Sequence, residues 1–286
     1  YEPFYLAQEL GYYQASHVRL IELSSTNQVV DALRANKVDT AALSLDEAIL
    51  LRQEGLPLKV IWVASLSDNS NAILVRDSIQ DLSQLKDKRI GVEQTAIGYY
   101  MLSQFLQFTG LNQDDIHITP MSADEHLDAW QNNKVDALIT FGAVLQILKK
   151  QHAKVVFDDT NTNKKVFGVV VATEKALACC STEIQSLIQG QQKALEYIKN
   201  NEESALISMA KRTQSTSQGV RQVLTTTQLL TTEQNQQMFR AGLNTHSVLA
   251  KEISQLVHQL MKSGLLSQPI KAIDVIDSRF MGLTYD

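Results

Sequence analysis

The feature that most constrains the fold of this chain is an internal repeat. Residues 31–39 read DALRANKVD and residues 128–136 read DAWQNNKVD, so six positions match at a spacing of 97 residues. A short apolar segment follows each copy, at residues 40–44 and at residues 137–141. This spacing is too long for a solenoid, whose repeats span roughly 20 to 45 residues. The repeat therefore predicts two similar α/β lobes, and two facing lobes make a cleft.

The apolar periodicity gives the second copy a complete α/β order. It predicts strands at residues 89–93, 116–120 and 136–141, and helices at residues 96–108, 122–131 and 142–150. Ser122 and Glu125 have the spacing of a capping box at the start of one of these helices. Each predicted helix follows a strand, as in an open α/β sheet.

The first copy has the same order but lacks the opening strand. Its predicted helices cover residues 3–13, 27–35 and 44–55, and its predicted strands cover residues 18–23, 39–43 and 58–65. Ser44 and Glu47 form another capping-box pattern. Neither a strand nor a charged, apolar signal segment precedes the first helix. We infer that the first strand of this lobe is missing from the chain and that the native amino terminus lies further upstream.

Two apolar segments outside the copies are expected to join the lobes. Residues 71–76 and 166–172 are predicted to be crossing strands that form a hinge. Lobe one would then comprise residues 1–75 and 170–286, and lobe two residues 76–169. The carboxyl-terminal part is predicted to be helical, with a long amphipathic helix over residues 183–200 and polar helices and connectors over residues 213–237. The predicted fold class is α/β with two lobes, a hinge of two crossing strands and a helical carboxyl-terminal part.

The expected ligand site lies at the loops that follow the strands. In open α/β sheets, ligands bind beyond the carboxyl ends of strands, where the unpaired N–H groups of helix amino termini point outward. The residues predicted to line the site on this basis are Ser44, Leu45, Asp46, Asn71, Thr95, Ala96, Gly98, Tyr99 and Phe141. The repeat makes Ser44 and Phe141 equivalent positions.

Several of these residues also have a purely structural explanation. Ser44 would serve as a helix N-cap, and Asp46 would stabilise the positive end of the helix dipole. Gly98 would permit close packing, while Tyr99 and Phe141 would belong to the core. Both interpretations remain open at the level of the sequence.

Composition excludes some classes of function. The net charge of -5 and the pI of about 5.7 argue against a nucleic-acid-binding protein. No apolar run approaches the roughly 18 residues of a membrane span. Cys179 and Cys180 are adjacent, so they cannot join distant parts of the fold, and they lack the spacing of a metal or redox site. Two free thiols near a helix start are favoured over a bridge between neighbours or between molecules.

Several motifs taken together resemble one family of transport proteins. The segments are PFYLAQELGYY at residues 3–13, VD at 38–39, LSLDEA at 43–48, DLSQLKDKRIGV at 81–92 and ADEH at 123–126. In this order they resemble the solute-binding proteins of ABC transporters for nitrate, alkanesulfonates, taurine and thiamine-pyrimidine precursors. The similarity covers residues 1–206 and weakens in the carboxyl-terminal helices.

The resemblance implies a two-lobe, type II periplasmic binding protein that delivers a small molecule to an ABC permease. It implies a removed signal or lipoprotein peptide, and hence a periplasmic or membrane-anchored extracellular location. It also adds Phe4 and Tyr5 to the ligand-binding residues, since family contacts follow the opening proline. The sequence departs from the family at residues 140–142, where many members carry Trp-Glu-Pro. No cofactor is expected, and the protein is expected to be a monomer.

The acidic residues near the predicted loops bear on the ligand. Asp46, Glu47 and Glu93 lie close to these loops, whereas no Arg or Lys does. Buried carboxylates need a cationic or hydrogen-donating partner, which favours a ligand with nitrogen donors, such as an amine, an aminopyrimidine or a zwitterion. A sulfonate remains the family alternative.

Two other functional classes were weighed. A sensory domain of a membrane receptor would bind by the same clamp and continue into a transmembrane helix. A pyrimidine-synthase-like enzyme would need a cofactor lysine and catalytic His and Cys residues. His17, His117, His126 and His152 are predicted at the surface or at element ends, without metal-binding spacing, so an enzyme is not expected.

Overall fold

The computed structural model describes residues 1–67, 71–158, 165–240 and 246–282. Contacts divide the chain into two units. Unit 1 comprises Tyr1–Leu23, Val29–Ser67 and Val166–Asp286, and unit 2 comprises Ser24–Gln28 and Asp68–Lys165. No helix in the described part of the chain combines the length and apolar character of a membrane span.

Unit 2 is built on a five-stranded mixed sheet. The strand order is β5-β4-β6-β3-β7, with β4 parallel to β5 and β6, and β3 antiparallel to β6 and β7. The strands are β3 (Asn71–Val75), β4 (Arg89–Glu93), β5 (His117–Met121), β6 (Ala137–Phe141) and β7 (Lys154–Asp158). The helices are α4 (Ala96–Thr109), α5 (His126–Gln131) and α6 (Gly142–Lys150), with short 3-10 turns at Leu82–Leu85, Gln113–Asp115 and Ala123–Glu125.

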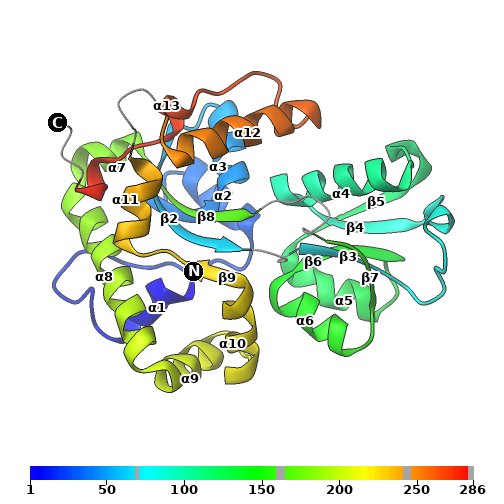
Figure 1. Ribbon diagram of the computed structural model, residues 1–286, viewed down its shortest axis with the longest axis horizontal. Coiled ribbons are helices and arrows are strands. Elements are labelled where there is room, and N and C mark those ends of the chain that lie inside the picture. Colours follow the sequence, from blue (N-terminus) through cyan, green and yellow to red (C-terminus); the bar gives the residue numbers. More distant parts are fainter. Residues whose placement is uncertain (68–70, 159–164, 241–245, 283–286) are drawn as a thin grey trace. The chain divides into compact units, whose positions relative to one another are not determined.

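Helices cover both faces of this sheet. Figure 1 shows α4 on one face and α5 and α6 on the other. One apolar cluster joins Met101, Leu102 and Phe105 of α4 to the sheet, and a second joins Trp130 of α5 and Leu148 of α6 to its opposite face. Because strands buried on both faces lack polar alternation, the β3 sequence NAILV is apolar after its first residue.

Unit 1 is built on a four-stranded antiparallel sheet. Its order is β1-β8-β2-β9, formed by β1 (Thr40–Ser44), β2 (Leu58–Ser67), β8 (Val166–Thr173) and β9 (Thr227–Leu229). One apolar core joins this sheet to its helices. These are α1 (Glu2–Glu9), α2 (Thr26–Arg34), α3 (Leu45–Gln53), α7 (Glu174–Cys179), α8 (Ser181–Asn200), α9 (Glu202–Arg212), α10 (Ser217–Thr226), α11 (Thr232–Phe239), α12 (Val248–Lys262) and α13 (Ala272–Val275), with a 3-10 turn at Arg279–Met281.

Each copy of the internal repeat covers the end of a helix and the turn that leads into a strand. Asn36 and Asn133 both have a left-handed backbone, with φ of 52° and 54°, which asparagine tolerates better than most residues. In both copies the next lysine donates its backbone N–H back into the helix, from Lys37 to Ala32 and from Lys134 to Ala129, each at 2.9 Å. The matching sequences therefore specify the same turn twice.

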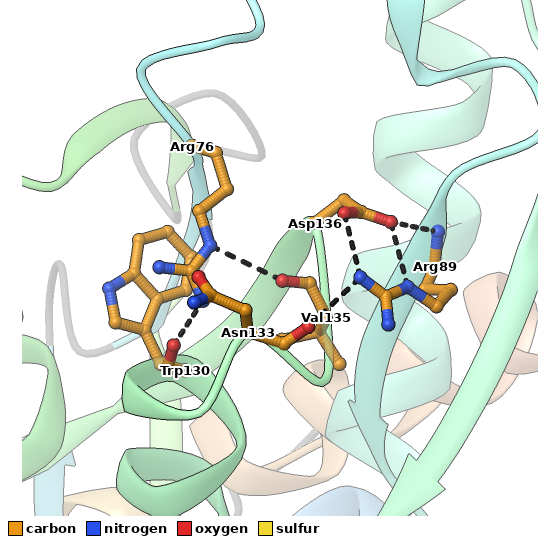
Figure 2. Close-up of polar contacts among 6 residues, drawn as sticks. All are labelled: Arg76, Arg89, Trp130, Asn133, Val135 and Asp136. Atoms are coloured by element: carbon orange, nitrogen blue, oxygen red, sulfur yellow. Dashed lines mark hydrogen bonds and ion pairs between the residues drawn. The ribbon is translucent and has the colours of Figure 1, made fainter.

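The second copy is also tied to neighbouring strands through two arginines, as Figure 2 shows. Arg89, at the start of β4, donates to both carboxylate oxygens of Asp136 at 3.0 Å, and its backbone N–H donates to the same carboxylate at 2.9 Å. Arg76 lies over the Trp130 ring, 4.1 Å from its centroid, and donates to the Trp130 and Val135 carbonyl oxygens. These contacts fix the turn against the neighbouring strands of the same unit.

The structure corrects several sequence predictions. Residues 18–23 form no strand ladder with any described residue. The expected crossing strands each belong to one sheet: β3 pairs with β6 and β7, and β8 pairs with β1 and β2. Residues 213–237 include a strand, β9, between α10 and α11.

The two expected capping boxes have different outcomes. The Ser122 backbone N–H and hydroxyl donate to Glu125, so this box is confirmed. Ser44 is the N-cap of α3, but its side chain makes no capping hydrogen bond. The box predicted there is therefore wrong.

Candidate functional site

In unit 1, the predicted site residues lie where β1 ends and α3 begins. Ser44 is the last residue of β1, and Leu45 and Asp46 open the first turn of α3. Ser44 is half-buried, whereas Asp46 is 6% exposed. The carboxylate of Asp46 therefore lies near the positive end of the helix dipole in a place that water barely reaches.

A row of small residues crosses the sheet beside Ser44. Gly168 of β8 is in register with both Ser44 of β1 and Ser65 of β2. A Cβ atom on Gly168 would lie 2.4 Å from the Ser65 hydroxyl oxygen and 3.3 Å from that of Tyr1. The absence of a side chain on Gly168 thus leaves room for two hydroxyl groups at this edge.

Tyr1 contributes a hydroxyl group to the same edge. It donates a hydrogen bond to the Leu43 carbonyl oxygen. Burial raises the pKa of the Tyr1 hydroxyl, and the negative charge of Asp46 raises it further, so this group remains a hydrogen-bond donor. Sequence reasoning missed Tyr1 because it precedes the first helix and belongs to no motif.

Phe4 and Tyr5 occupy different surroundings in α1. Phe4 is 5% exposed and belongs to the unit 1 core. Tyr5 lies beneath the Arg212 guanidinium, 3.9 Å from ring centroid to Cζ. Arg212 is held in place by Glu2 and by Glu22, to which it donates at 2.7 Å. Ligand contact by Phe4 and Tyr5 stays a prediction.

In unit 2, Thr95 organises the loop between β4 and α4. Its hydroxyl accepts the Gly98 backbone N–H at 3.3 Å, as an N-cap, and lies 3.3 Å from a Glu93 carboxylate oxygen. Thr95 and Glu93 are 5% and 4% exposed. A Cβ atom on Gly98 would lie 2.3 Å from the Glu93 carbonyl oxygen. Close packing alone therefore requires glycine here, and its contact with a ligand stays a prediction.

The remaining predicted residues of unit 2 lie around the same sheet edge. Asn71, which is 5% exposed, pairs with Phe141 in the antiparallel register of β3 and β6. Ala96, at the start of α4, is buried, and Tyr99 is half-buried one turn further along. The structure thus brings Asn71, Thr95, Ala96 and Phe141 to the ends of adjoining strands of one sheet.

A buried histidine supports Phe141. The His126 ring lies edge-on to Phe141 at 5.8 Å between centroids, and its Nδ1 is 3.1 Å from the Thr140 hydroxyl. His126 is 1% exposed and is the first residue of α5, so of the two predicted places, the surface or an element end, it lies at the second. Burial lowers its pKa to about 4, and the ring is neutral at physiological pH.

The adjacent cysteines form a disulfide between Cys179 and Cys180. The prediction of two free thiols is therefore wrong. The bond lies at the junction of α7 and α8, where Cys180 departs from helical geometry with φ of -130°. Among the described residues, no three His, Cys, Asp or Glu side chains gather in a way that could hold a metal ion.

Comparison with known proteins relates this architecture to a set of transport proteins. The chain is 25% identical over 137 residues to the taurine-binding periplasmic protein of Escherichia coli K12. The match covers 48% of this chain and 42% of that protein, so the aligned stretch spans less than half of the relative.

Solved structures extend the similarity to nearly the whole fold. The alkanesulfonate-binding protein SsuA from Xanthomonas axonopodis pv. citri, bound to MOPS, has a TM-score of 0.76 at 16% identity over 96% of this chain and 94% of that one. The desulfurization enzyme DSZB has a TM-score of 0.64 at 16% identity, covering 98% and 94% of the two chains. The fold is that of the periplasmic binding proteins, as the sequence predicted.

A family model supplies the remaining assignment. The model described as NMT1/THI5 like matches residues 1–205, which is more than two thirds of the chain. The protein therefore belongs to the NMT1/THI5-like family.

Proposed function

We propose that this chain is an extracytoplasmic solute-binding protein that captures a small molecule between its two lobes and passes it to an ABC importer. The observation that carries the proposal is the family match, combined with strand ends in each unit that lead into helix amino termini beside buried polar side chains. Such ends supply preformed N–H donors for a ligand. The periplasmic relative supports a periplasmic location.

The ligand we propose is a small zwitterion with a cationic nitrogen and an acidic group, such as an aminosulfonate. The amino termini of α3 and α4 suit the anionic group. The buried carboxylates of Asp46 and Glu93 suit a cationic nitrogen, because a carboxylate removed from water is stabilised by an opposite charge. A relative that binds taurine supports a ligand with both groups.

The experiment is a calorimetric titration with three related compounds. Taurine carries both groups, ethanesulfonate lacks the amine, and ethylamine lacks the sulfonate. We expect saturable binding of taurine and much weaker binding of the other two. Equal affinity for ethanesulfonate would overturn the role of the carboxylates, and saturable binding of ethylamine alone would overturn the role of the helix amino termini.

An enzymatic role is the second candidate, because the DSZB enzyme shares the fold. The two roles differ in the fate of the ligand. A binding protein returns its ligand unchanged after prolonged incubation, which mass spectrometry of the released compound measures. Appearance of a product that depends on protein concentration would replace the transport role with a catalytic one.

A further inference from the structure

The strand β2 of unit 1 carries more residues than the strand with which it pairs. The ten residues of β2 lie against the eight residues of β8. The register shifts twice along this pairing, and the second shift lies between Val63 and Ser65. Such a shift is a β-bulge, in which one strand has an extra residue without a partner on the other. The extra residue of the second bulge is Ala64, close to the end of β2.

The second bulge decides which side chain of β2 stands beside Gly168. With the bulge, Ser65 is in register with Gly168, which is itself in register with Ser44. Without the extra residue, Ala64 would take that place and Ser65 would lie opposite Phe167. Because successive side chains of a strand point to opposite faces, the Ser65 hydroxyl would then leave the face that it shares with Ser44. Bulges beside functional sites commonly redirect a side chain in this way.

A buried asparagine of α11 holds the backbone at this bulge. The Asn235 side-chain oxygen accepts the Val63 N–H at 2.7 Å, and its side-chain nitrogen donates to the Val63 carbonyl oxygen at 2.9 Å. The same nitrogen donates to the Thr231 carbonyl oxygen at 3.1 Å. Asn235 is 0% exposed, so water does not compete for these hydrogen bonds. The amide of Asn235 thus pairs with the β2 backbone as a neighbouring strand would.

The strand β9 holds the residues that follow. The Leu230 N–H donates to the Ala64 carbonyl oxygen at 3.1 Å, and Ser65 pairs with β9. The residue before the bulge is therefore held by Asn235, and the bulge and the residue after it are held by β9 and its next residue. Both supports come from a part of the chain beyond residues 1–205, which the family model matches. The direction of the Ser65 side chain is thus set from outside the family match.

The Ser65 hydroxyl has room and lacks a partner within the protein. Its oxygen lies over Gly168, because a Cβ atom on that glycine would lie 2.4 Å from it. Ser65 is half-buried, and no residue in the described part of the chain forms a hydrogen bond with its hydroxyl. The Ser44 hydroxyl, in the same row, makes no capping hydrogen bond either. Since partly buried polar groups usually have a partner, the Ser65 hydroxyl is suited to receive one from a ligand.

We propose that Ser65 is a ligand-binding residue of unit 1 and that Asn235 is the positioning residue that orients it, by holding the β-bulge at Ala64. The Ser65 hydroxyl donates a hydrogen bond to the anionic group of the ligand, since bonds to an ionised acceptor are stronger than neutral ones. Asn235 is fully buried and affects affinity through Ser65. This inference rests on the proposed solute-binding function and adds a neutral donor to its site.

Calorimetric titration with taurine tests the role of Ser65. Ser65→Ala should weaken binding by about tenfold or more, with little change in melting temperature, because the hydroxyl has no partner in the described part of the protein. Ser254→Ala is the matched control, since Ser254 is exposed on α12, and it should bind as the parent chain does. Parent binding that Ser65→Ala leaves unchanged would overturn this inference alone. No binding by the parent would overturn the solute-binding role on which it rests.

A double-mutant cycle separates positioning by Asn235 from general support of the fold. Asn235→Leu keeps the size of the side chain but leaves the Val63 backbone groups unpaired. It should lower the melting temperature by several degrees and weaken taurine binding by about tenfold. In the Ser65→Ala background it should lower the melting temperature equally but weaken binding no further, because the hydroxyl that it displaces is absent. An effect on affinity that is equal in both backgrounds, or absent from both, would overturn the positioning role.

A further variant tests the bulge without changing Asn235. Ala64→Ser combined with Ser65→Ala moves the hydroxyl by one residue while the bulge stays in place. Ala64 is 3% exposed and has no partner on β8, so a hydroxyl there should not reach the ligand. Taurine affinity should therefore stay at the level of Ser65→Ala. Affinity restored to the level of the parent chain would overturn the role of the bulge, even where Asn235→Leu fails to fold.

Discussion

The two copies of the repeat share a backbone but differ in what holds them. Both end a helix at a left-handed asparagine, Asn36 or Asn133, and both lead into a strand. In unit 2, Arg89 and Arg76 tie the turn to neighbouring strands, whereas in unit 1 the corresponding side of β1 borders a cavity. The difference teaches that the motif encodes a local turn and that its tertiary anchoring is encoded elsewhere in the chain.

The comparison extends to the residues near the strand ends. His126 and Thr140 form a buried polar pair in unit 2, and the positions 97 residues earlier are Val29 and Leu43 in unit 1. The shared scaffold thus carries a polar support on one side and an apolar one on the other. Four predictions test how far the two copies differ.

The largest effect is expected at the buried apolar position that both copies share, although its residue differs between them. Trp130 and its equivalent Leu33 are 7% and 0% exposed and pack in separate cores. Trp130→Ala should reduce the free energy of unfolding by about 3–5 kcal/mol and Leu33→Ala by about 2–5 kcal/mol, because each leaves a cavity. Urea unfolding measures both. A loss below about 1 kcal/mol at either position would break the equivalence.

The second prediction concerns the pH dependence of stability, to which the buried His126 of unit 2 contributes. His126 has a pKa of about 4 in the folded chain, below its unfolded value near 6.5, so the unfolded state binds the extra proton as pH falls. Stability linked to His126 is therefore present above pH 6.5 and lost as pH falls toward 4, by about 2 kcal/mol at pH 5.

A His126→Gln variant should lack this loss when urea unfolding is compared between neutral pH and pH 5. The matched control is His117→Gln, since His117 is exposed. If His126→Gln retained the full pH dependence of the parent chain, the buried histidine would not be its source.

A smaller effect should separate the two aspartates that close the repeat. Asp136→Ala removes the partner of Arg89 and should lower the melting temperature by a few degrees, while Asp39→Ala should leave this chain unchanged. Hydrogen bonds among half-exposed groups are screened by water, so the shift stays moderate. Equal shifts in the two variants would remove the proposed difference in anchoring.

The smallest effect should be shared by both copies. Asn36→Ala and Asn133→Ala remove the short polar side chain that lets asparagine adopt the left-handed region by local hydrogen bonding, which should reduce the free energy of unfolding by about 1 kcal/mol each. The glycine variants at the same positions serve as controls and should be close to neutral. A loss confined to one copy would show that the turns are not energetically equivalent.

Much of unit 2 was predictable because its elements have local signals. The predicted strand at residues 89–93 and helix at residues 142–150 coincide with β4 and α6. The Ser122 box depends on residues three positions apart. By contrast, the buried His126 contacts Thr140, which is 14 residues away in the sequence. The apolar periodicity of a single segment cannot reveal such a contact. Residues 18–23 have a strand pattern, but a ladder requires a partner strand as well as the pattern.

The candidate site was predictable in its positions and less so in its contacts. The strand-end rule identified Ser44, Asp46 and Thr95, all of which lie at the start of helices in the structure. It missed Tyr1 and the space that Gly168 leaves beside Ser65, because these residues come from parts of the chain that are distant in sequence. Adjacent cysteines alone did not distinguish thiols from the disulfide, since the decision depends on the backbone between α7 and α8.

The most direct test of the solute-binding proposal is the calorimetric affinity of the parent chain and of Asp46→Asn for taurine. Asp114→Asn is the matched control, since Asp114 is exposed and lies outside the predicted site. We expect saturable binding by the parent and the control, and at least about tenfold weaker binding by Asp46→Asn, which corresponds to about 1.4 kcal/mol. Undiminished affinity in Asp46→Asn, or no binding by the parent chain, would contradict the proposed capture of a zwitterion.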